Sequence, residues 1–296
     1  MTLSVSYVTN SSASVASCRY RILSPARYLD SQKVPISIGP TADKLNSVVV
    51  FSKHWTYNDY MYALFCKARG QKVVFDVCDD HFEGPLGDHY KRMVSTAHLI
   101  TVNSDVMRNR VIQMTGKDAT VIEDPVLSER KPYNPERPKG MLWYGQTPNI
   151  KVLYEAYPKD CTVPLLVVVP GRLEPPEHFN KPWIAWAQWH EGIINDAAEA
   201  TSMALLPYPA NKQAKSANRV LEALNVGIPV LTNSIPSVNR IPCGWREIQQ
   251  DLQEQVDSLM KVDWTEEMQL AQAFVDKNYS QEAIGERWKE ELEALV

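Results

Sequence analysis

Short apolar runs alternate with segments of helical periodicity along almost the whole chain. An unbroken apolar run of about 4–8 residues is typical of a parallel strand that is buried on both faces. Strands of this kind that alternate with helices predict an α/β fold, with a parallel sheet covered by helices on both faces. In the first half, the predicted strands span residues 4–8, 35–38, 47–51, 72–77, 99–103 and 120–123, and the predicted helices span residues 18–29, 58–68, 88–96 and 105–114.

A charged, proline-rich segment interrupts this pattern at residues 127–139. Its three prolines and dense charge are typical of a linker. The alternation then resumes, which predicts a second α/β domain, and Ser280 has the side chain and position of a cap for a final helix. The predicted strands of this half span residues 141–144, 165–169, 183–188, 203–206 and 229–232, with a helix over residues 151–156 and another that ends at Gly227.

Composition and charge narrow the classes of function. The 296 residues are enough for two domains, and 44% of them are hydrophobic, so each domain can form a core. The formal net charge of −4 gives no support to tight nonspecific binding of nucleic acid or of an anionic membrane. No apolar run approaches the ~20 residues of a membrane-spanning helix, so we expect no integral membrane association.

The cysteines and the N-terminus favour a cytoplasmic protein. The five cysteines are scattered, and none pairs with another cysteine or a histidine at zinc-binding spacing. This usage is typical of reduced thiols in the cytosol. Residues 1–8 lack the basic start and the long apolar core of a signal peptide, and instead have the pattern of a first strand.

The segment from residue 215 to residue 231 carries the strongest functional signal. The spacing of Val220, Leu221 and Leu224 indicates a helix, and polar and basic side chains gather where it begins. A helix N-terminus offers free N–H groups and a partial positive charge, so these side chains favour a phosphate site. The alternative is an ordinary βαβ unit with a capped helix. The predicted phosphate-binding residues are Lys215, Ser216, Asn218 and Arg219.

This segment resembles the donor-binding segment of glycosyltransferases of group 1, or family 4, which have the GT-B fold. In that family a strand ended by proline leads to a helix with a glutamate and then to Gly-x-Pro-Val, and Glu222, Gly227 and Pro229 fit this pattern. The family often has a second glutamate at the position of Ala214. Some branches instead carry Lys-Ser-x-Asn-Arg, as this chain does at residues 215–219.

The resemblance covers the whole chain and implies its domain organisation. It implies two Rossmann-like domains whose parallel sheets face each other across a cleft. An acceptor-binding domain would span residues 1–130, and a nucleotide-sugar-binding domain would span residues 138–278. A C-terminal helix at residues 279–296 would pack back on the first domain.

The resemblance also implies donor contacts in the second half. The counterpart of Glu222 accepts hydrogen bonds from the ribose. The loop after the first strand of this half commonly supplies a basic residue to the diphosphate, but here it holds Gly145 and Gln146, so Lys151 is the nearest basic candidate. Relatives hold the nucleobase near position 189, where a tryptophan could stack on the base or belong to the core. The remaining donor candidates are Arg172, Trp189 and His190.

The loop after the strand at residues 72–77 holds the catalytic candidates. Ligands of open α/β sheets bind beyond the carboxyl ends of the strands, and this loop carries Asp79, Asp80 and His81 in consecutive positions. A glycosyl transfer needs a group that orients the acceptor, receives its proton or stabilises positive charge. Members of the family often place a histidine or an acidic residue here, so Asp80 and His81 rank before Asp79. The alternative is a helix cap beside an exposed histidine.

Two further loops supply candidates on the acceptor side. Family members often have a glycine-rich loop after the first strand, and the small side chains of Ser11, Ser12 and Ser14 would still let the backbone approach a ligand. Arg19 and Arg21 could bind an anion, or they could be solvated. His54 follows the third strand and could contact a substrate or pack beside a neighbouring tryptophan.

The implied reaction is transfer of a sugar from a UDP- or GDP-sugar to an acceptor, with retention of configuration as the default. No metal or other cofactor is expected, because the helix dipole and basic side chains neutralise the diphosphate. The acceptor stays open among a polysaccharide, a small molecule, a lipid and a modified DNA base, and we expect a monomer or a weak dimer. The alternatives are a sugar-nucleotide epimerase on the same fold and a noncatalytic nucleotide-sugar-binding protein.

Overall fold

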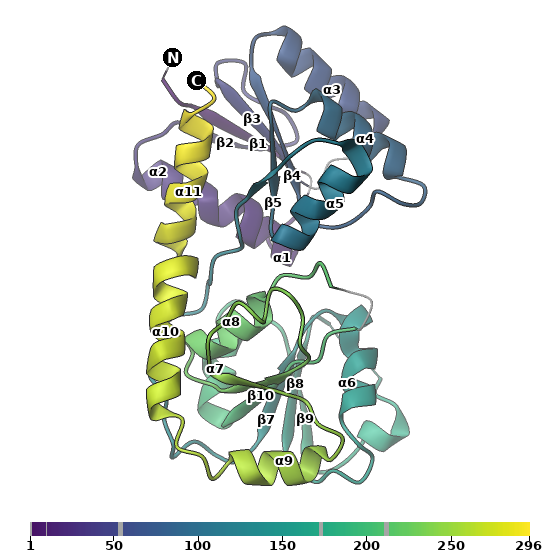
Figure 1. Cartoon of the computed structure of the whole chain (residues 1–296), viewed down its shortest axis with the longest axis vertical. Coiled ribbons are helices and arrows are strands. Elements are labelled where there is room, and N and C mark those ends of the chain that lie inside the picture. The colour runs from purple at the N-terminus through teal and green to yellow at the C-terminus, as the bar shows by residue number, and fades with distance from the viewer. Residues whose placement is uncertain (1, 10, 53–55, 172–173, 210–212) are drawn as a thin grey trace. The chain divides into compact units, whose positions relative to one another are not determined.

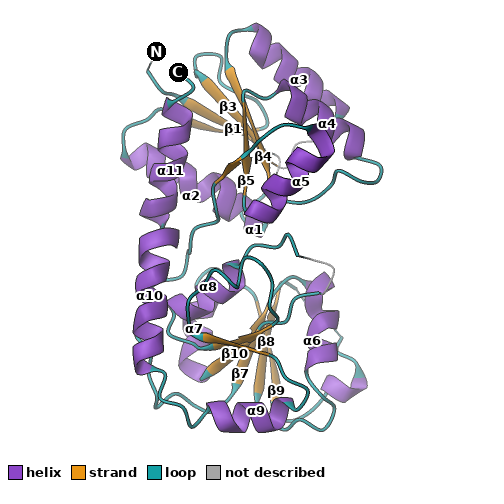
Figure 2. Cartoon of the chain, in the orientation of Figure 1, coloured by secondary structure: helices purple, strands orange, loops and turns teal. Residues whose placement is uncertain are grey.

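The computed structural model describes residues 2–9, 11–52, 56–171, 174–209 and 213–296. The chain forms two compact units. The first unit comprises Met1–Pro125, Ala214–Ser216 and Asn278–Val296, and the second comprises Val126–Gln213 and Ala217–Lys277. Each unit holds a six-stranded sheet in which all strand pairs are parallel (Figures 1 and 2). The predicted α/β class with two parallel sheets is confirmed.

The sheet of the first unit has the order β2-β1-β3-β4-β5-β6. All of its predicted strands are present, with bounds that differ from the prediction by at most two residues. β3 and β4 lie in the middle of the sheet, and their apolar runs are buried, as the unbroken pattern predicts. The strands are β1 (Val5–Val8), β2 (Ile36–Gly39), β3 (Val48–Ser52), β4 (Lys72–Val77), β5 (Leu99–Val102) and β6 (Thr120–Val121).

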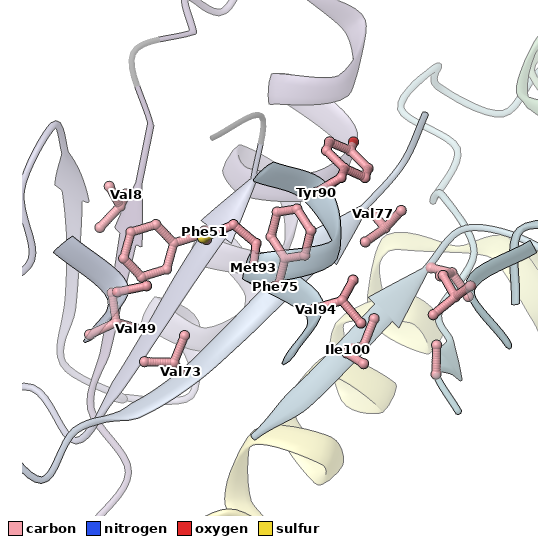
Figure 3. Close-up of a cluster of buried hydrophobic side chains, with 14 of the residues drawn as sticks. Val8, Val49, Phe51, Val73, Phe75, Val77, Tyr90, Met93, Val94 and Ile100 are labelled. Atoms are coloured by element: carbon pink, nitrogen blue, oxygen red, sulfur yellow. The ribbon is translucent and has the colours of Figure 1, made fainter. Parts of the chain in front are cut away.

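Helices cover both faces of this sheet, and each face has its own core. On one face, side chains such as Phe51, Phe75 and Tyr90 gather in a single cluster (Figure 3). On the other face, Ile22 and Trp288 belong to a second cluster. The helices are α1 (Ala16–Cys18), a π-helical turn (Arg19–Leu23), α2 (Ser24–Ser31), α3 (Tyr57–Ala68), α4 (Gly87–Thr96), α5 (Asp105–Thr115) and α11 (Gln281–Glu293).

The C-terminal helix α11 belongs to the first unit. Ser280 caps it, since the hydroxyl accepts a hydrogen bond from the amide of Ala283 at 3.1 Å, and this predicted cap is confirmed. Gly285 lies against α2, where an added Cβ would be 2.2 Å from the ring of Tyr28. A larger residue at position 285 would therefore push the two helices apart.

The sheet of the second unit has the order β12-β11-β10-β7-β8-β9. Counted from β7, this is the order 6-5-4-1-2-3 of the Rossmann fold, with its switch point between β7 and β10. The strands are β7 (Met141–Tyr144), β8 (Leu165–Val169), β9 (Ile184–Gln188), β10 (Met203–Leu205), β11 (Val230–Thr232) and β12 (Trp245–Glu247). The helices are α6 (Ile150–Ala156), α7 (Ile193–Ala200), α8 (Asn218–Asn225), α9 (Leu252–Leu259) and α10 (Thr265–Tyr279), with short 3₁₀ turns at Thr147–Asn149 and Glu177–Phe179.

The segment predicted to be a linker lies wholly within the second unit, where side chains hold its backbone. Both carboxylate oxygens of Glu222 accept hydrogen bonds, from the amides of Leu127 and Ser128, each at 2.9 Å. The side chain of Asn195 accepts from the amide of Glu129 at 3.3 Å and donates to its carbonyl at 2.8 Å. Consecutive peptide groups of this segment are thus satisfied by side chains of α7 and α8.

The same segment continues against the end of α8. Gln272 of α10 donates to the carbonyl of Lys131 at 2.6 Å. Gly227 has a φ of +73°, and an added Cβ there would lie 2.6 Å from the carbonyl oxygen of Pro132. Arg137 donates to the carbonyl of Gly227 at 2.6 Å. Glycine at 227 therefore permits both the left-handed turn and the close approach of the two backbones.

Candidate functional site

Arg219 spans the switch point of the second unit. It lies in the first turn of α8, and its Nη1 donates to the carbonyl of Tyr144 at the end of β7, at 3.3 Å. Its Nη2 donates to the carbonyl of Pro207, just after β10, at 3.0 Å. The guanidinium carbon lies 4.6 Å from the centroid of the Tyr208 ring. One half-buried arginine thus links the two strand ends where a Rossmann sheet binds its ligand.

The positive charge of Arg219 is not neutralised by an ion pair. Among the residues that the structure describes, its guanidinium is hydrogen-bonded to carbonyl oxygens and paired with no carboxylate. A carbonyl oxygen carries only a partial negative charge, so these contacts do not cancel the charge of the guanidinium. The neighbouring Tyr144 stays a donor, since burial and then the charge of Glu222 raise its pKa, and its hydroxyl donates to the carbonyl of Arg219.

The loop after β7 is small and exposed. A Cβ at Gly145 would lie 3.1 Å from the ring of Trp143 and 3.4 Å from Arg219. Gly145 therefore leaves room for both of these side chains at the switch point. Gln146 and Lys151 are exposed, and Lys151 lies in the first turn of α6. These three predicted donor residues are thus near the end of β7.

The four predicted phosphate-binding residues divide between the two units. Asn218 and Arg219 begin α8, whose N-cap residue is Ala217. Lys215 and Ser216 group with the first unit, where Nζ of Lys215 lies 3.4 Å from Oδ1 of Asp79. Each of the two pairs lies within one unit, and binding of a phosphate by all four remains a prediction.

Glu222 is buried, with 5% of its surface exposed. Its two oxygens accept the amides of Leu127 and Ser128, a contact that the sequence did not predict. The predicted contact of Glu222 with a ribose hydroxyl stays a prediction.

The predicted nucleobase region follows β9. The amide of Trp189 donates to the carbonyl of Val169 at 2.8 Å, so the residue extends the strand pairing, and its side chain is half-buried. His190 is exposed, with Nε2 4.0 Å from the carboxylate of Asp196. Both side chains are thus positioned at the carboxyl edge of the sheet. Arg172 and, in the first unit, His54 lie outside the described residues.

The catalytic candidates of the first unit lie together after β4. Oδ2 of Asp80 accepts from Nε of Arg110 at 2.9 Å, and Oδ1 accepts from the amide of Phe82 at 3.2 Å. Asp79 pairs with Lys215, as described above. The half-buried ring of His81 lies edge-to-face against Tyr90, with centroids 5.5 Å apart. Two carboxylates and an imidazole therefore share one loop at the carboxyl edge of the sheet.

A buried network beneath this loop was not predicted from the sequence. Arg21 has 1% of its surface exposed and donates to Asp76 through Nε at 3.1 Å and Nη2 at 2.6 Å. Ser52 and Thr101 donate to the same carboxylate, each at 2.9 Å. Nη1 of Arg21 lies 3.2 Å from the carboxylate of Asp124. The expectation that Arg21 could bind an anion is therefore wrong, because internal carboxylates surround it.

The charge state of this network follows from its neighbours. Burial alone lowers the pKa of Arg21, but Asp76 and Asp124 raise it above its ordinary value. Burial, and then the charge of Asp76, raise the pKa of Tyr7. Arg21 and Asp76 thus form a buried ion pair, and the hydroxyl groups of Ser52 and Thr101 donate hydrogen bonds to its carboxylate.

The serine-rich loop after β1 is mostly exposed. The hydroxyls of Ser12 and Ser14 are hydrogen-bonded to each other, and the amide of Ser11 donates to the Thr9 hydroxyl at 3.0 Å. Nη1 of Arg19 donates to the carbonyl of Ser14 at 3.1 Å. These contacts give the loop a defined turn at the carboxyl edge of the sheet.

Within the described residues, no group of three or more His, Cys, Asp and Glu residues could hold a metal ion. None of the helices that the structure describes is both long and apolar enough to cross a membrane.

Comparison with known proteins identifies the fold. No protein-family model matches the sequence, and no curated protein matches it. The structure is similar to that of Anabaena HepE, solved with UDP and glucose, with 12% identity over 99% of this chain and 100% of that chain and a TM-score of 0.72. It is also similar to the DNA-modifying enzyme β-glucosyltransferase, solved with and without uridine diphosphoglucose, with 11% identity over 99% of both chains and a TM-score of 0.61.

A third similar structure is the glycosyltransferase SnogD from Streptomyces nogalater, with 10% identity over 98% of this chain and 99% of that chain. Its TM-score is 0.53. These similarities extend over both units, and the sheets have the Rossmann-like strand orders described above. The chain therefore has the GT-B fold of glycosyltransferases.

Proposed function

We propose that this chain is a glycosyltransferase that moves a sugar from a nucleotide diphosphate sugar to an acceptor. The observation that carries the proposal is Arg219, whose unneutralised charge lies at the switch point of a Rossmann-ordered sheet. The similar folds of HepE and β-glucosyltransferase, solved with UDP and with uridine diphosphoglucose, support a UDP-sugar as the first donor to test.

The diphosphate would bind at the start of α8. Arg219 supplies a full charge, and the first turn of α8 supplies backbone N–H groups and the positive end of the helix dipole. Asn218, Ser216 and Lys215 would add hydrogen bonds from the same stretch of chain. Because these groups can balance the diphosphate charge, the proposal includes binding without a divalent metal.

The nucleoside would extend from the diphosphate along the edge of the second sheet. Glu222, whose carboxylate is fixed by the Leu127 and Ser128 amides, would accept a hydrogen bond from a ribose hydroxyl. Trp189 and His190, after β9, are candidates for the base. Gln146 and Lys151, after β7, are further donor contacts.

The acceptor would bind to the first unit. Asp80 and His81 are the candidates for orienting an acceptor hydroxyl and receiving its proton, with Asp79 beside them. We propose retention of configuration as the default outcome. Ser11, Ser12, Ser14 and Arg19 provide a polar loop at the same sheet edge for the rest of the acceptor.

Calorimetry in excess chelator tests the donor site. We expect UDP or GDP to bind without added metal. Failure of every common nucleoside diphosphate to bind in chelator would contradict the metal-independent donor site. Incubation of radiolabelled nucleotide sugars with pools of polysaccharides, small molecules, lipids and DNA tests transfer. Nucleotide binding with neither transfer nor epimerisation would favour a noncatalytic nucleotide-sugar-binding protein.

A further inference from the structure

We propose that Tyr90 and Asn103 are positioning residues that set the conformation of the loop carrying Asp79, Asp80 and His81. The inference rests on the proposed function, because a fixed loop matters for catalysis only if Asp80 or His81 takes part in glycosyl transfer. Neither residue carries a role in the expectations from sequence. Both are buried side chains that hydrogen-bond to the backbone of this loop.

Tyr90 supports the loop from α4. Its side chain is almost fully buried, and its hydroxyl donates to the carbonyl of Asp79 at 3.1 Å. Its ring is edge-to-face with three aromatic rings, of which Phe75 and Phe82 lie 5.3 Å and 5.2 Å away and His81 lies 5.5 Å away. The same residue thus holds the backbone of one candidate and the ring of another.

Asn103 supports the loop from the end of β5. Its Nδ2 donates to the carbonyl of Cys78 at 3.2 Å, one residue before Asp79. Its Oδ1 is buried and, among the described residues, has no hydrogen-bond partner. A buried acceptor without a partner costs about 1–3 kcal/mol, whereas an apolar side chain of the same size avoids this cost. Fold stability alone therefore does not account for asparagine at this position.

The far end of the loop is fixed as well. The amide of Phe82 donates to Oδ1 of Asp80 at 3.2 Å, which closes a turn around the carboxylate. An added Cβ at Gly87 would lie 2.3 Å from the carbonyl oxygen of Phe82, so the start of α4 is in direct contact with the loop backbone. With Cys78 and Asp79 held at the near end, the loop is supported on both sides of the candidate residues.

Tyr90→Phe tests this proposal with little change in volume. It removes the hydrogen bond to Asp79 but keeps the ring in the core. Tyr62→Phe is a matched control, because Tyr62 packs on the same cluster and its hydroxyl contacts the amide of Ala42, at 2.7 Å, and the thiol of Cys66, both away from the loop. Since a 1 Å misplacement can lower a rate ~10²-fold, we expect Tyr90→Phe to lower kcat about 10-fold, with the KM for the donor changed less than about 2-fold. Equal kcat values in the two variants would overturn the proposal for Tyr90.

Asn103→Leu separates positioning from stability. The substitution removes the donor to Cys78 and also the unpartnered acceptor. We expect the midpoint of thermal unfolding to stay the same or rise, while kcat falls about 10-fold. An unchanged kcat would overturn the proposal for Asn103. A fall in both kcat and the unfolding midpoint would show a structural role and would also overturn it.

A measurement without turnover separates this proposal from the proposed function. The imidazole protons of His81, assigned by their loss in His81→Ala, can be followed by NMR in the full chain. We expect Tyr90→Phe to move their chemical shifts and Tyr62→Phe to leave these unchanged. If the His81 signals move in Tyr90→Phe but the protein has no transferase activity, the proposed function is rejected and the positioning role is supported. An unmoved signal in Tyr90→Phe would reject the positioning role.

Discussion

The carboxyl ends of the two sheets present different charged side chains on similar architecture. In the first unit, Asp76, Asp79 and Asp80 lie at or just after the end of β4. In the second unit, the corresponding edge has Arg219 at the switch point and the start of α8 beside it. A carboxylate-rich edge suits work on hydroxyl groups and protons, and a positive edge suits a phosphate. The difference shows that the loops, rather than the shared strand pattern, determine what each sheet can bind.

Two arginines make the comparison sharper. Arg21 and Arg219 each connect two strand ends through the guanidinium group, those of β4 and β6 for Arg21 and those of β7 and β10 for Arg219. Arg21 is bonded to the carboxylates of Asp76 and Asp124, so its charge is balanced inside the protein. Arg219 is bonded to carbonyl oxygens, so its charge is left for a ligand. The chemical nature of the internal partner thus distinguishes a structural arginine from the arginine that we propose binds phosphate.

The largest expected effect is the loss of fold stability when Arg21 loses its carboxylate partner. Asp76→Asn leaves the buried charge of Arg21 without its main partner, and breaking a buried ion pair in this way costs about 3–5 kcal/mol. We expect the free energy of unfolding, measured with urea, to fall by about that amount. Asp118→Asn is the control, because its ion pair with Arg108 is exposed. Similar losses in the two variants would contradict a special role for the buried pair.

The carboxylate-rich edge is tested by Asp80→Asn and His81→Ala, side by side. Removal of a general base typically lowers turnover ~10²–10⁴-fold. We expect one of the two variants to show a loss of that size with a known acceptor, while the donor affinity stays nearly constant. Normal turnover in both would mean that this loop is only a turn stabilised by Arg110 and Tyr90, and His54 and the loop at Ser11–Ser14 would be tested next.

The positive edge is tested by Arg219→Ala and Lys215→Ala. A charge-assisted hydrogen bond contributes about 1.5–3 kcal/mol, so each substitution should weaken nucleotide binding about tenfold or more in calorimetry. The unfolding midpoint should change little for Lys215→Ala, since that side chain is exposed. Arg108→Ala, on the exposed surface of the first unit, should leave the affinity unchanged. Unchanged affinity in both test variants would place the phosphate elsewhere, with Arg172 and Lys151 as the next candidates.

The smallest expected effect is on the pH dependence of fold stability, through the ion pair of Arg246 and Glu267, which takes no part in either proposed site. Hydrogen bonding to Arg246, at 2.9 Å and 2.6 Å, lowers the pKa of Glu267 in the folded protein. A carboxylate with a lowered folded pKa stabilises the fold above its unfolded pKa, and this contribution is lost as the pH falls through the folded pKa. Since the pair is partly exposed, Glu267→Gln should reduce stability at neutral pH by less than about 1 kcal/mol. The difference from the original chain should vanish in acid, and a difference that grows in acid would contradict the assignment.

The sequence predicts the inner strands well and the polar edge elements poorly. β3 and β8 are unbroken apolar runs, and such a run leaves few alternatives to a buried strand. β12 has the sequence Trp-Arg-Glu at the edge of its sheet, without a run or an alternation that could identify it. α7 and α10 were missed although a signal exists. In α10, Met268, Ala271 and Val275 recur at helical spacing and are buried, but dense Glu and Gln residues surround them.

The candidate site is predictable in position but not in role. Strand ends mark the loops that can bind ligands, and the loops with Asp79–His81 and the start of α8 were identified in this way. The roles depend on contacts that are distant in sequence. Arg21 and Asp76 are 55 positions apart, and no local pattern shows that they meet. In the same way, the amides of Leu127 and Ser128 in the proline-rich segment donate hydrogen bonds to Glu222. The sequence around Glu222 does not show these contacts.

The fixed backbone of the proline-rich segment has a consequence for proteolysis. Arg130 is an exposed basic residue in a proline-rich, charged segment, so the composition suggests a site where trypsin would cut readily. A protease must first free several consecutive peptide groups, and here Glu222, Asn195 and Gln272 hold them against α7, α8 and α10. Cutting after Arg130 thus requires the second unit itself to open, because the amide of Lys131 also donates to the carbonyl of Asn225 at 3.0 Å. The rate of that cut would measure the local stability of the second unit rather than the flexibility of a linker.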